Sequence, residues 1–140
     1  MVEKSQPTDS PFTHWQHYGG DKGNTHYSEL NQINAGNVQH LQMEWTYHSA
    51  AGKPIHPTSE LQVNPIIVDG VLFGRNPLHN VFAIKADTGK PIASFGQQGR
   101  LDLRQGLGRE PEKISIYAPS PGVIYNDLII IGTAVTEGLG

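Results

Sequence analysis

The chain has 140 residues, enough for one ordinary domain with its own core. Its net charge of -3 excludes the basic footprint of a nucleic-acid-binding protein, and the lack of cysteine excludes disulfides and thiolate metal sites. Charged residues make up only 16% of the chain, while 16 glycines and 10 prolines favour many turns and short strands over long helices.

Neither a leader nor a membrane segment is expected from the sequence. Residues 1–15 contain no apolar run, so we expect no signal peptide in this chain. The longest apolar stretch, Leu128–Ile131, is far too short to cross a bilayer, so we expect no membrane span. We therefore expect a soluble chain, or the trimmed part of an exported protein.

The first third of the chain predicts little regular structure. Residues 1–12 are polar with two prolines and predict a flexible arm. Asn34–Leu41 predicts one or two helical turns. Met43–His48 predicts a short strand, with Trp45 and Tyr47 on one face because alternate side chains of a strand point the same way.

The middle of the chain has the pattern of antiparallel strands. Asp69-Gly70 lies between two apolar runs, and this dipeptide in that setting is the strongest short signal for a hairpin. The predicted elements, in chain order, are strands over Pro65–Val68, Val71–Phe73, Val81–Ile84 and Pro91–Phe95, and a long polar loop over 97–113.

The hairpin pattern returns near the C-terminus. Pro121 begins the same order of apolar run, Asp-containing turn and apolar run that begins at Pro65, 56 residues earlier, and Asn126-Asp127 is the second turn. Repetition of a small antiparallel unit indicates propeller blades of roughly 40–50 residues, whereas two unrelated hairpins in a β-sandwich are the alternative. We expect Trp45 and Leu128–Ile131 to be largely buried, because they are the most apolar strand candidates.

Several motifs follow one another in an order typical of one enzyme family. The opening runs Trp15-Gln16-His17-Tyr18-Gly19-Gly20-Asp21, then Tyr27-Ser28-Glu29-Leu30-Asn31-Gln32-Ile33-Asn34, then Asn37-Val38 and Trp45-Thr46-Tyr47. Further along come Asn64–Phe73, Val81–Ile84 with Asp87-Thr88-Gly89-Lys90, and Ser120–Leu128. This order resembles the start and the first blades of the pyrroloquinoline quinone (PQQ) dehydrogenases that oxidise alcohols and sugars.

The resemblance covers roughly residues 12–140 and implies an all-β fold, a partial β-propeller of two to three antiparallel blades from a family eight-bladed propeller. We assign this incomplete segment to residues 13–140. The resemblance also implies PQQ and calcium near the propeller axis, an alcohol or sugar as substrate, and a periplasmic location. The family's catalytic Asp comes from blades beyond Gly140. We therefore expect no catalytic base in this chain, no activity of the chain by itself and no binding of either cofactor by it alone.

Three residues are candidates for contact with these cofactors by resemblance. Glu137 lies five residues after Gly132, where the family places a Ca²⁺-binding glutamate; the alternative is a solvated Glu in a terminal loop. Gln62 stands where many members have a Glu near the quinone, or is a polar residue that leads into a strand. Thr133 lies where relatives use a hydroxyl to hold a quinone carboxylate, which Ala134 could not do.

Other functions stay open at this point. His14-x-x-His17 has the residue type for zinc, but its place in a loop without further convergent ligands argues against that metal. The chain could instead be a non-catalytic propeller scaffold or protein-interaction module, or come from a shortened or rearranged reading frame. A propeller hides its strand edges by closing, and two or three blades cannot close. We therefore expect open strand edges through which the chain could associate with itself.

Overall fold

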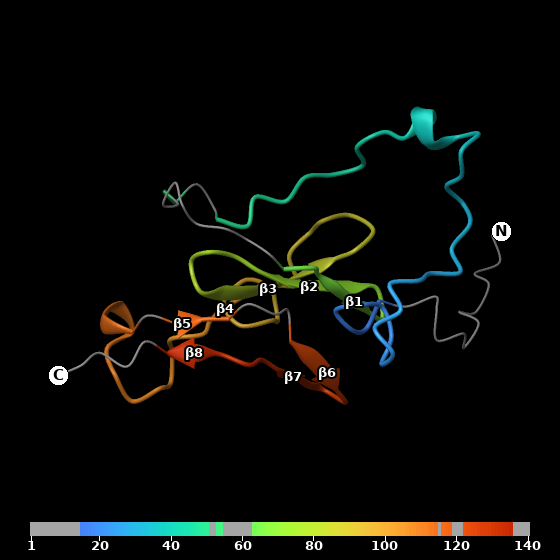
Figure 1. The fold of residues 1–140 in the computed structure, drawn as a ribbon. Coiled ribbons are helices and arrows are strands. Elements are labelled where there is room, and N and C mark those ends of the chain that lie inside the picture. Colours follow the sequence, from blue (N-terminus) through green and yellow to red (C-terminus); the bar gives the residue numbers. More distant parts are fainter. Residues whose placement is uncertain (1–14, 51–52, 55–62, 115, 119–121, 136–140) are drawn as a thin grey trace.

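The computed structural model describes residues 15–50, 53–54, 63–114, 116–118 and 122–135, which are all-β apart from two short 3₁₀ turns. This confirms the predicted fold class; the predicted arm over residues 1–12 lies outside the described part (Figure 1). The 3₁₀ turns are η1 (Val38–His40) and η2 (Pro111–Lys113). The strands are β1 (Ile66–Val68), β2 (Val71–Arg75), β3 (Asn80–Lys85), β4 (Arg100–Asp102), β5 (Ile116–Tyr117), β6 (Val123–Tyr125), β7 (Leu128–Ile130) and β8 (Ala134–Val135).

The first four strands form one antiparallel sheet in the order β1-β2-β3-β4. Val68 pairs with Val71, so Asp69 and Gly70 make a two-residue turn, as the sequence predicts. Their φ angles of 49° and 73° are both positive, and a type I′ turn requires this at its two central residues. The twist of that turn matches the twist of the strands, which is why this dipeptide predicts the hairpin so well.

The predicted fourth strand, Pro91–Phe95, is wrong, and the sheet instead takes its fourth strand from the predicted loop. Pro91 makes a single bridge with Ile84, and Ile92 N–H donates to the Ala83 carbonyl at 2.9 Å before the chain turns away. A proline has no N–H to donate to a neighbouring strand, so Pro91 reduces the backbone pairing that a strand at this position would need. The chain returns at β4, where Arg100 pairs with Phe82.

The 3₁₀ turn η1 confirms the helical turn that the sequence predicts near Asn34. The Asn34 side-chain Oδ1 accepts from Gly36 N–H at 2.9 Å, and its carbonyl accepts from Val38 N–H at 2.9 Å.

The prediction of a strand over Met43–His48 is wrong, but the predicted alternation of its side chains is found. Its chain is outside regular secondary structure, although Trp45 and Tyr47 are both half-buried while Glu44 and Thr46 are exposed.

Strand β3 is the centre of the core because it is buried on both faces of the sheet. Val81, Phe82, Ala83 and Ile84 are all buried, whereas Lys85 at its end is exposed. Cross-strand pairing places side chains on the same face. One face therefore carries Leu72, Phe82 and Ile84, and the other carries Ile66, Phe73 and Ala83.

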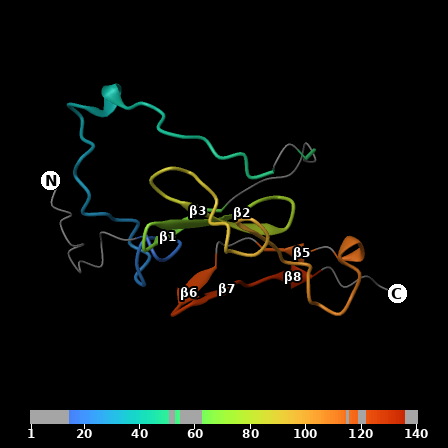
Figure 2. The same cartoon turned by 180° about the vertical axis from the view of Figure 1, so that it is seen from behind.

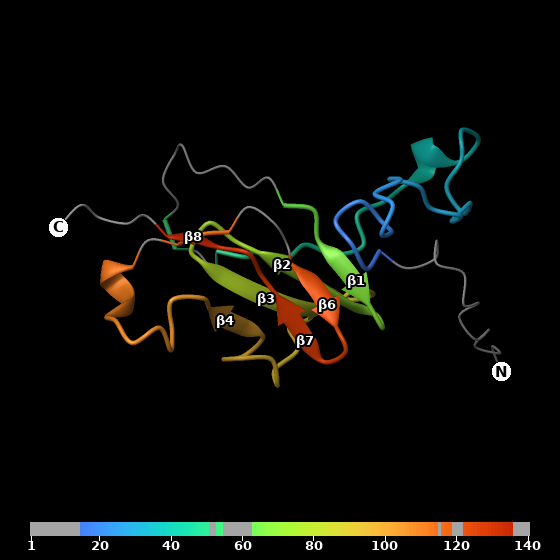
Figure 3. The same ribbon diagram turned by 60° about the horizontal axis from the view of Figure 1, so that its bottom comes forward.

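The last four strands form a second antiparallel unit, which we call the ribbon. β6 pairs with β7 around Asn126-Asp127, and β5 pairs with β8 further along the same two chain segments. In the sequence, residues 118–122 separate β5 from β6, and residues 131–133 separate β7 from β8. The second predicted hairpin is therefore confirmed, and Figure 3 shows it crossing one face of the four-stranded sheet.

The ribbon lies against the sheet face that carries Phe73. Ile124 and Ile129 line a pocket of about 260 Å³ together with Val71, Phe73 and Phe95. At the other end of the ribbon two side chains of the sheet reach its backbone. The Arg75 guanidinium donates to the Ala118 carbonyl, and His79 Nδ1 donates to the Ile116 carbonyl at 2.8 Å.

The expected burial of Leu128–Ile131 is wrong for the outer face of the ribbon. Leu128 and Ile130 are each 57% exposed. Their direct cross-strand partners, Tyr125 and Val123, are 65% and 48% exposed. Ile129, on the opposite face, is half-buried. The reason is that the four-stranded sheet covers one face of this hairpin only.

An ion pair fixes the end of β4. The Arg104 guanidinium donates to both Asp102 carboxylate oxygens, at 2.9 and 2.7 Å, and the two side chains are about three-quarters buried. The hydrogen bond from the Arg104 side chain lowers the pKa of Asp102, and the Arg104 backbone N–H and charge add to this effect against the opposing effect of burial. The same bond raises the pKa of Arg104.

Two glycines of β2 and its turn allow a matched test of this packing. Gly70→Ala adds a methyl group where no atom lies within 4 Å, but at positive φ, so we expect a loss of about 1 kcal/mol from backbone strain alone. Gly74→Ala places its methyl carbon 2.5 Å from Phe82 Cζ, so we expect a loss of about 1–3 kcal/mol from overpacking. Urea unfolding followed by tryptophan fluorescence measures both. Adding Phe82→Leu should restore part of the lost stability to Gly74→Ala, because it removes the ring that the new methyl group meets, but should restore none to Gly70→Ala. If it restores stability to neither variant, this packing is contradicted.

The Asp102–Arg104 pair should make stability depend on pH in the acid range. A carboxyl whose pKa is lowered by folding stabilises the fold above its unfolded pKa and loses that contribution as the pH falls through the folded pKa. At pH 7 we expect Asp102→Asn to lower the free energy of unfolding by about 0.5–1 kcal/mol. Denaturant titrations should show the difference in free energy of unfolding between the wild type and Asp102→Asn shrinking below about pH 4. Arg104→Ala should show the same loss and the same pH dependence, and a gap that persists unchanged at low pH would contradict the assignment.

Candidate functional site

The structure describes one of the three residues that the resemblance singles out. Gln62 and Glu137 lie outside the described residues. Thr133 is exposed in the stretch between β7 and β8, on the ribbon side of the sheet. Val63, the neighbour of Gln62, lines a pocket on the other face of the sheet. Of the three positions, the described residues therefore place Thr133 alone.

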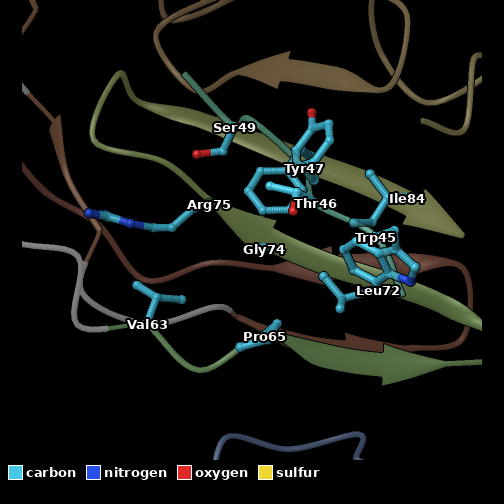
Figure 4. A pocket seen from close by; sticks show the side chains of 11 residues that line it. Trp45, Thr46, Tyr47, Ser49, Val63, Pro65, Leu72, Gly74, Arg75 and Ile84 are labelled. Carbon is cyan, nitrogen blue, oxygen red and sulfur yellow. The ribbon is translucent and has the colours of Figure 1, made fainter. Parts of the chain in front are cut away.

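This pocket has a volume of about 420 Å³. It lies between the four-stranded sheet and residues 43–49, which we call the covering segment (Figure 4). Its walls are mainly apolar, with polar groups from few residues. The lining residues are Trp45, Thr46, Tyr47, Ser49, Val63, Pro65, Leu72, Gly74, Arg75, Phe82 and Ile84.

Trp45 fixes one end of the covering segment on the turn after β3. Its indole N–H donates to the Ala86 carbonyl at 3.2 Å. Its ring lies against Gly89, where a Cβ atom would be 2.6 Å from Trp45 Cε3. Gly89 also has a φ of 66°, so the close approach of the ring and the backbone conformation both require glycine there.

Tyr47 fixes the middle of the covering segment on β3 and β4. Its ring centre is 4.9 Å from that of Phe82, at a tilt of 50°. Phe82 in turn lies over Gly74, which has no side chain to obstruct it. Arg100 Nε donates to the Tyr47 hydroxyl at 3.0 Å, and another nitrogen of the same guanidinium donates to the His48 carbonyl at 3.2 Å.

Asn76 fixes the end of the covering segment and is buried, with 1% of its surface exposed. Its amide nitrogen donates to the Ser49 carbonyl at 2.7 Å. Its Oδ1 accepts from Leu78 N–H at 3.0 Å and from Asn80 N–H at 3.1 Å. One side chain thus closes the turn before β3 and ties that turn to the covering segment.

These polar contacts were not predicted from the sequence. A signal was available in Gly74-Arg75-Asn76-Pro77, because polar residues directly after an apolar strand commonly make local or cross-element hydrogen bonds. Arg75 and Asn76 reach different layers, the ribbon and the covering segment. Their observed roles are structural, since each donates to a main-chain carbonyl.

The described residues contain no cluster of metal-binding side chains. Across the described ranges, no three His, Asp or Glu side chains lie close enough together to hold a metal ion. His14, the first residue of the His14-x-x-His17 motif considered for zinc, lies outside these ranges. The pKa of Asp21 is lowered mainly by the Thr25 backbone N–H, so this carboxylate also serves a local turn.

No helix within the described ranges has the length and apolar character needed to cross a membrane.

Comparison with known proteins gives consistent matches. The family of glucose, ethanol and alcohol dehydrogenase PQQ β-propeller domains matches residues 15–91 and 78–140. A quinate/shikimate dehydrogenase (quinone) of Acinetobacter baylyi is 37% identical over 81 residues, which are 56% of this chain and 10% of that protein. A quinohemoprotein alcohol dehydrogenase of Comamonas testosteroni is 33% identical over 84 residues, 60% of this chain and 11% of that protein.

A longer alignment joins this chain to a quinoprotein glucose dehydrogenase of Gluconobacter oxydans, at 25% identity over 203 residues, 95% of this chain and 25% of that protein. The chain thus spans between a tenth and a quarter of the length of these relatives. No solved structure matches significantly.

The Asn76 contacts predict a large effect of one substitution far from any expected chemistry. Asn76→Ala leaves the Ser49 carbonyl and two N–H groups without their partner, so we expect a loss of about 2–3 kcal/mol. Asn80→Ala, which removes one clear side-chain bond to the Leu78 carbonyl, should cost about 1 kcal/mol. Chemical unfolding with tryptophan fluorescence measures both. Equal losses would show that Asn76 does not hold the covering segment.

The family match extends over both antiparallel units of the structure and over the covering segment that packs on them. Because it includes well over half of the chain, the chain belongs to the family of PQQ-dependent dehydrogenase β-propeller domains.

Proposed function

We propose that the chain forms the first blades of a PQQ-dependent dehydrogenase of alcohols or sugars and is inactive by itself. The observation that carries this proposal is the family match across residues 15–140, which spans two stacked antiparallel units. Its relatives include proteins named for the oxidation of an alcohol and of glucose. We place the function in the periplasm on the same grounds.

Three side chains would face the cofactors in this function. The Glu137 carboxylate suits a calcium ion, since hard cations prefer oxygen ligands. The Thr133 hydroxyl can donate to a quinone carboxylate, and its exposure between β7 and β8 leaves it accessible. Gln62 offers both an amide donor and a carbonyl acceptor. PQQ, when bound, supplies the redox chemistry, while the protein binds and orients it.

Inactivity follows from what the reaction requires. A substrate hydroxyl must lose its proton to a base, and the family's Asp for this task comes from blades beyond Gly140. Loss of a general base typically lowers a rate by about 10²–10⁴-fold. An unclosed propeller would also leave the site wet, and water weakens each electrostatic contact with the cofactor.

A second function, a non-catalytic propeller scaffold, is favoured by one observation. The ribbon exposes a set of large apolar side chains, as surfaces for other proteins commonly do. Turnover when a second polypeptide is added would separate the two functions, because the chain is proposed to be inactive by itself and a scaffold would give none in either case.

We expect purified chain with PQQ and Ca²⁺ to reduce no dye with primary alcohols or aldoses, and to show no PQQ binding in the micromolar range by calorimetry. Any weaker binding should fall in Glu137→Gln and in Thr133→Val, but not in Glu112→Gln, which makes the same chemical change in η2. Micromolar binding by a monomer, or turnover lost in Glu137→Gln, would overturn the expected inactivity. Turnover only with a second polypeptide would support a dehydrogenase divided between two chains.

A further inference from the structure

A second pocket lies at the end of the sheet where β3 begins, and its lining is polar. It has a volume of about 250 Å³ and lies between the end of the covering segment, the loop before β3 and the residues of β4. Figure 2 shows the covering segment, in teal, reaching the loop between β2 and β3. Eight of the ten described residues that line this pocket have polar or charged side chains, the exceptions being Ala50 and Leu78. We call it the polar pocket.

A tight loop before β4 places Gln97 and Arg100 together at the polar pocket. Gln97 N–H donates to the Arg100 carbonyl at 2.6 Å, and Arg100 N–H donates to the Gln97 carbonyl at 3.2 Å. Gln98 has a φ of 52°, a left-handed conformation that is unfavourable for residues other than glycine. A side chain at Gly96 would collide with the Arg100 carbonyl. This loop therefore holds both side chains at fixed positions in the pocket wall.

The Arg100 guanidinium is held in place with one nitrogen to spare. Its Nε donates to the Tyr47 hydroxyl at 3.0 Å, and its Nη2 donates to the His48 carbonyl at 3.2 Å. Its central carbon lies 5.6 Å from the centre of the Tyr47 ring. Within the described ranges, Nη1 has no hydrogen-bond partner. A guanidinium fixed in this way can bind a carboxylate with little further loss of side-chain freedom.

Four further side chains in the pocket wall have polar ends that make no contact with the protein. In the described part of the chain, the side chains of Ser49, Lys53, Gln97 and Gln105 form no hydrogen bond or ion pair. An ammonium group only donates, whereas a hydroxyl and an amide both donate and accept. Single side chains of this kind on a surface bind water, but here they converge on one concave site. The pocket thus combines donors for an anion with acceptors that a simple anion would not use.

The charges of the pocket favour an anion. Lys53 and Arg100 contribute two positive charges, and Asp102 contributes one negative charge. The Asp102 carboxylate oxygens accept from the Arg104 guanidinium at 2.9 and 2.7 Å, so an adjacent cation offsets this negative charge. A concave surface with an excess of one charge raises the local concentration of ligands of the opposite charge.

We propose that the polar pocket binds a small organic acid with several hydroxyl groups, such as a sugar acid. Its carboxylate lies against Arg100 and Lys53, and its hydroxyl groups exchange hydrogen bonds with Ser49, Gln97 and Gln105. Hydroxyl groups donate and accept, so they match the amides as an inorganic anion does not. The volume of about 250 Å³ is below the range for drug-sized ligands and suits such a compound. This goes beyond the proposed function and depends neither on PQQ nor on an unpaired strand.

Calorimetric titration of the whole chain with gluconate at pH 7 tests the proposal. We expect one site with a Kd of roughly 1 mM or lower, as suits a ligand of about a dozen non-hydrogen atoms. Glucose lacks the carboxylate, and acetate and inorganic phosphate lack the chain of hydroxyl groups, so each should bind at least tenfold more weakly. The proposal is overturned if any of these three binds as tightly as gluconate, or if gluconate does not bind at tenfold higher concentration.

Substitutions locate the binding to the pocket. Lys53→Gln removes a positive charge but no contact within the described part of the chain, so we expect the Kd for gluconate to rise at least about fivefold. Lys85→Gln makes the same change at the exposed end of β3 and should bind like the wild type. Gln105→Leu should weaken gluconate binding similarly and leave acetate binding unchanged. Unaltered gluconate binding in both Lys53→Gln and Gln105→Leu would place the ligand elsewhere and overturn the proposal.

Arg100 needs a separate check, because it also holds the covering segment. Arg100→Lys keeps the charge but loses the planar group, so we expect the Kd for gluconate to rise at least tenfold. Circular dichroism and Trp45 fluorescence show whether this variant is folded. If it is not, Lys53→Gln and Gln105→Leu decide the matter, since neither side chain contacts the described part of the chain through a hydrogen bond or ion pair.

Discussion

The four-stranded sheet is apolar on both faces, and this constraint governs the rest of the structure. β3 contributes buried side chains in both directions, with Phe82 and Ile84 on one face and Val81 and Ala83 on the other. Burial of apolar surface contributes roughly 25 cal/mol per Å², so each face needs a covering layer. The ribbon covers one face, and the covering segment covers part of the other.

Small residues allow the covering segment to approach the sheet closely. Phe82 lies over Gly74, Tyr47 packs on Phe82, and Trp45 packs on Gly89. Arg100 of β4 and Asn76 of the turn between β2 and β3 then donate to main-chain carbonyls of the segment. Side chains make these contacts, so the segment is held on the sheet without backbone pairing to it.

This arrangement explains how part of a PQQ-dependent dehydrogenase propeller can form a folded core. A propeller sheet packs on its neighbours, so each unit can form its core locally. The cofactor site that the resemblance implies instead draws on several blades around an axis. The chain spans only a tenth to a quarter of the relatives that it matches, and the described residues contain no metal-binding cluster.

Features that depend on neighbouring residues could be predicted from the sequence. Asp69-Gly70 and Asn126-Asp127 predicted both hairpins, because turn geometry is decided by the residues in the turn. The family and its fold class were also predicted, from the order of motifs. The candidate contacts Gln62, Thr133 and Glu137 rested on that resemblance alone and stay predictions. Three features could not be predicted in this way: which stretch forms the fourth strand, that Met43–His48 lies unpaired, and that Leu128 and Ile130 are exposed. These features depend on partners distant in sequence, and an apolar strand is buried only where another layer covers it.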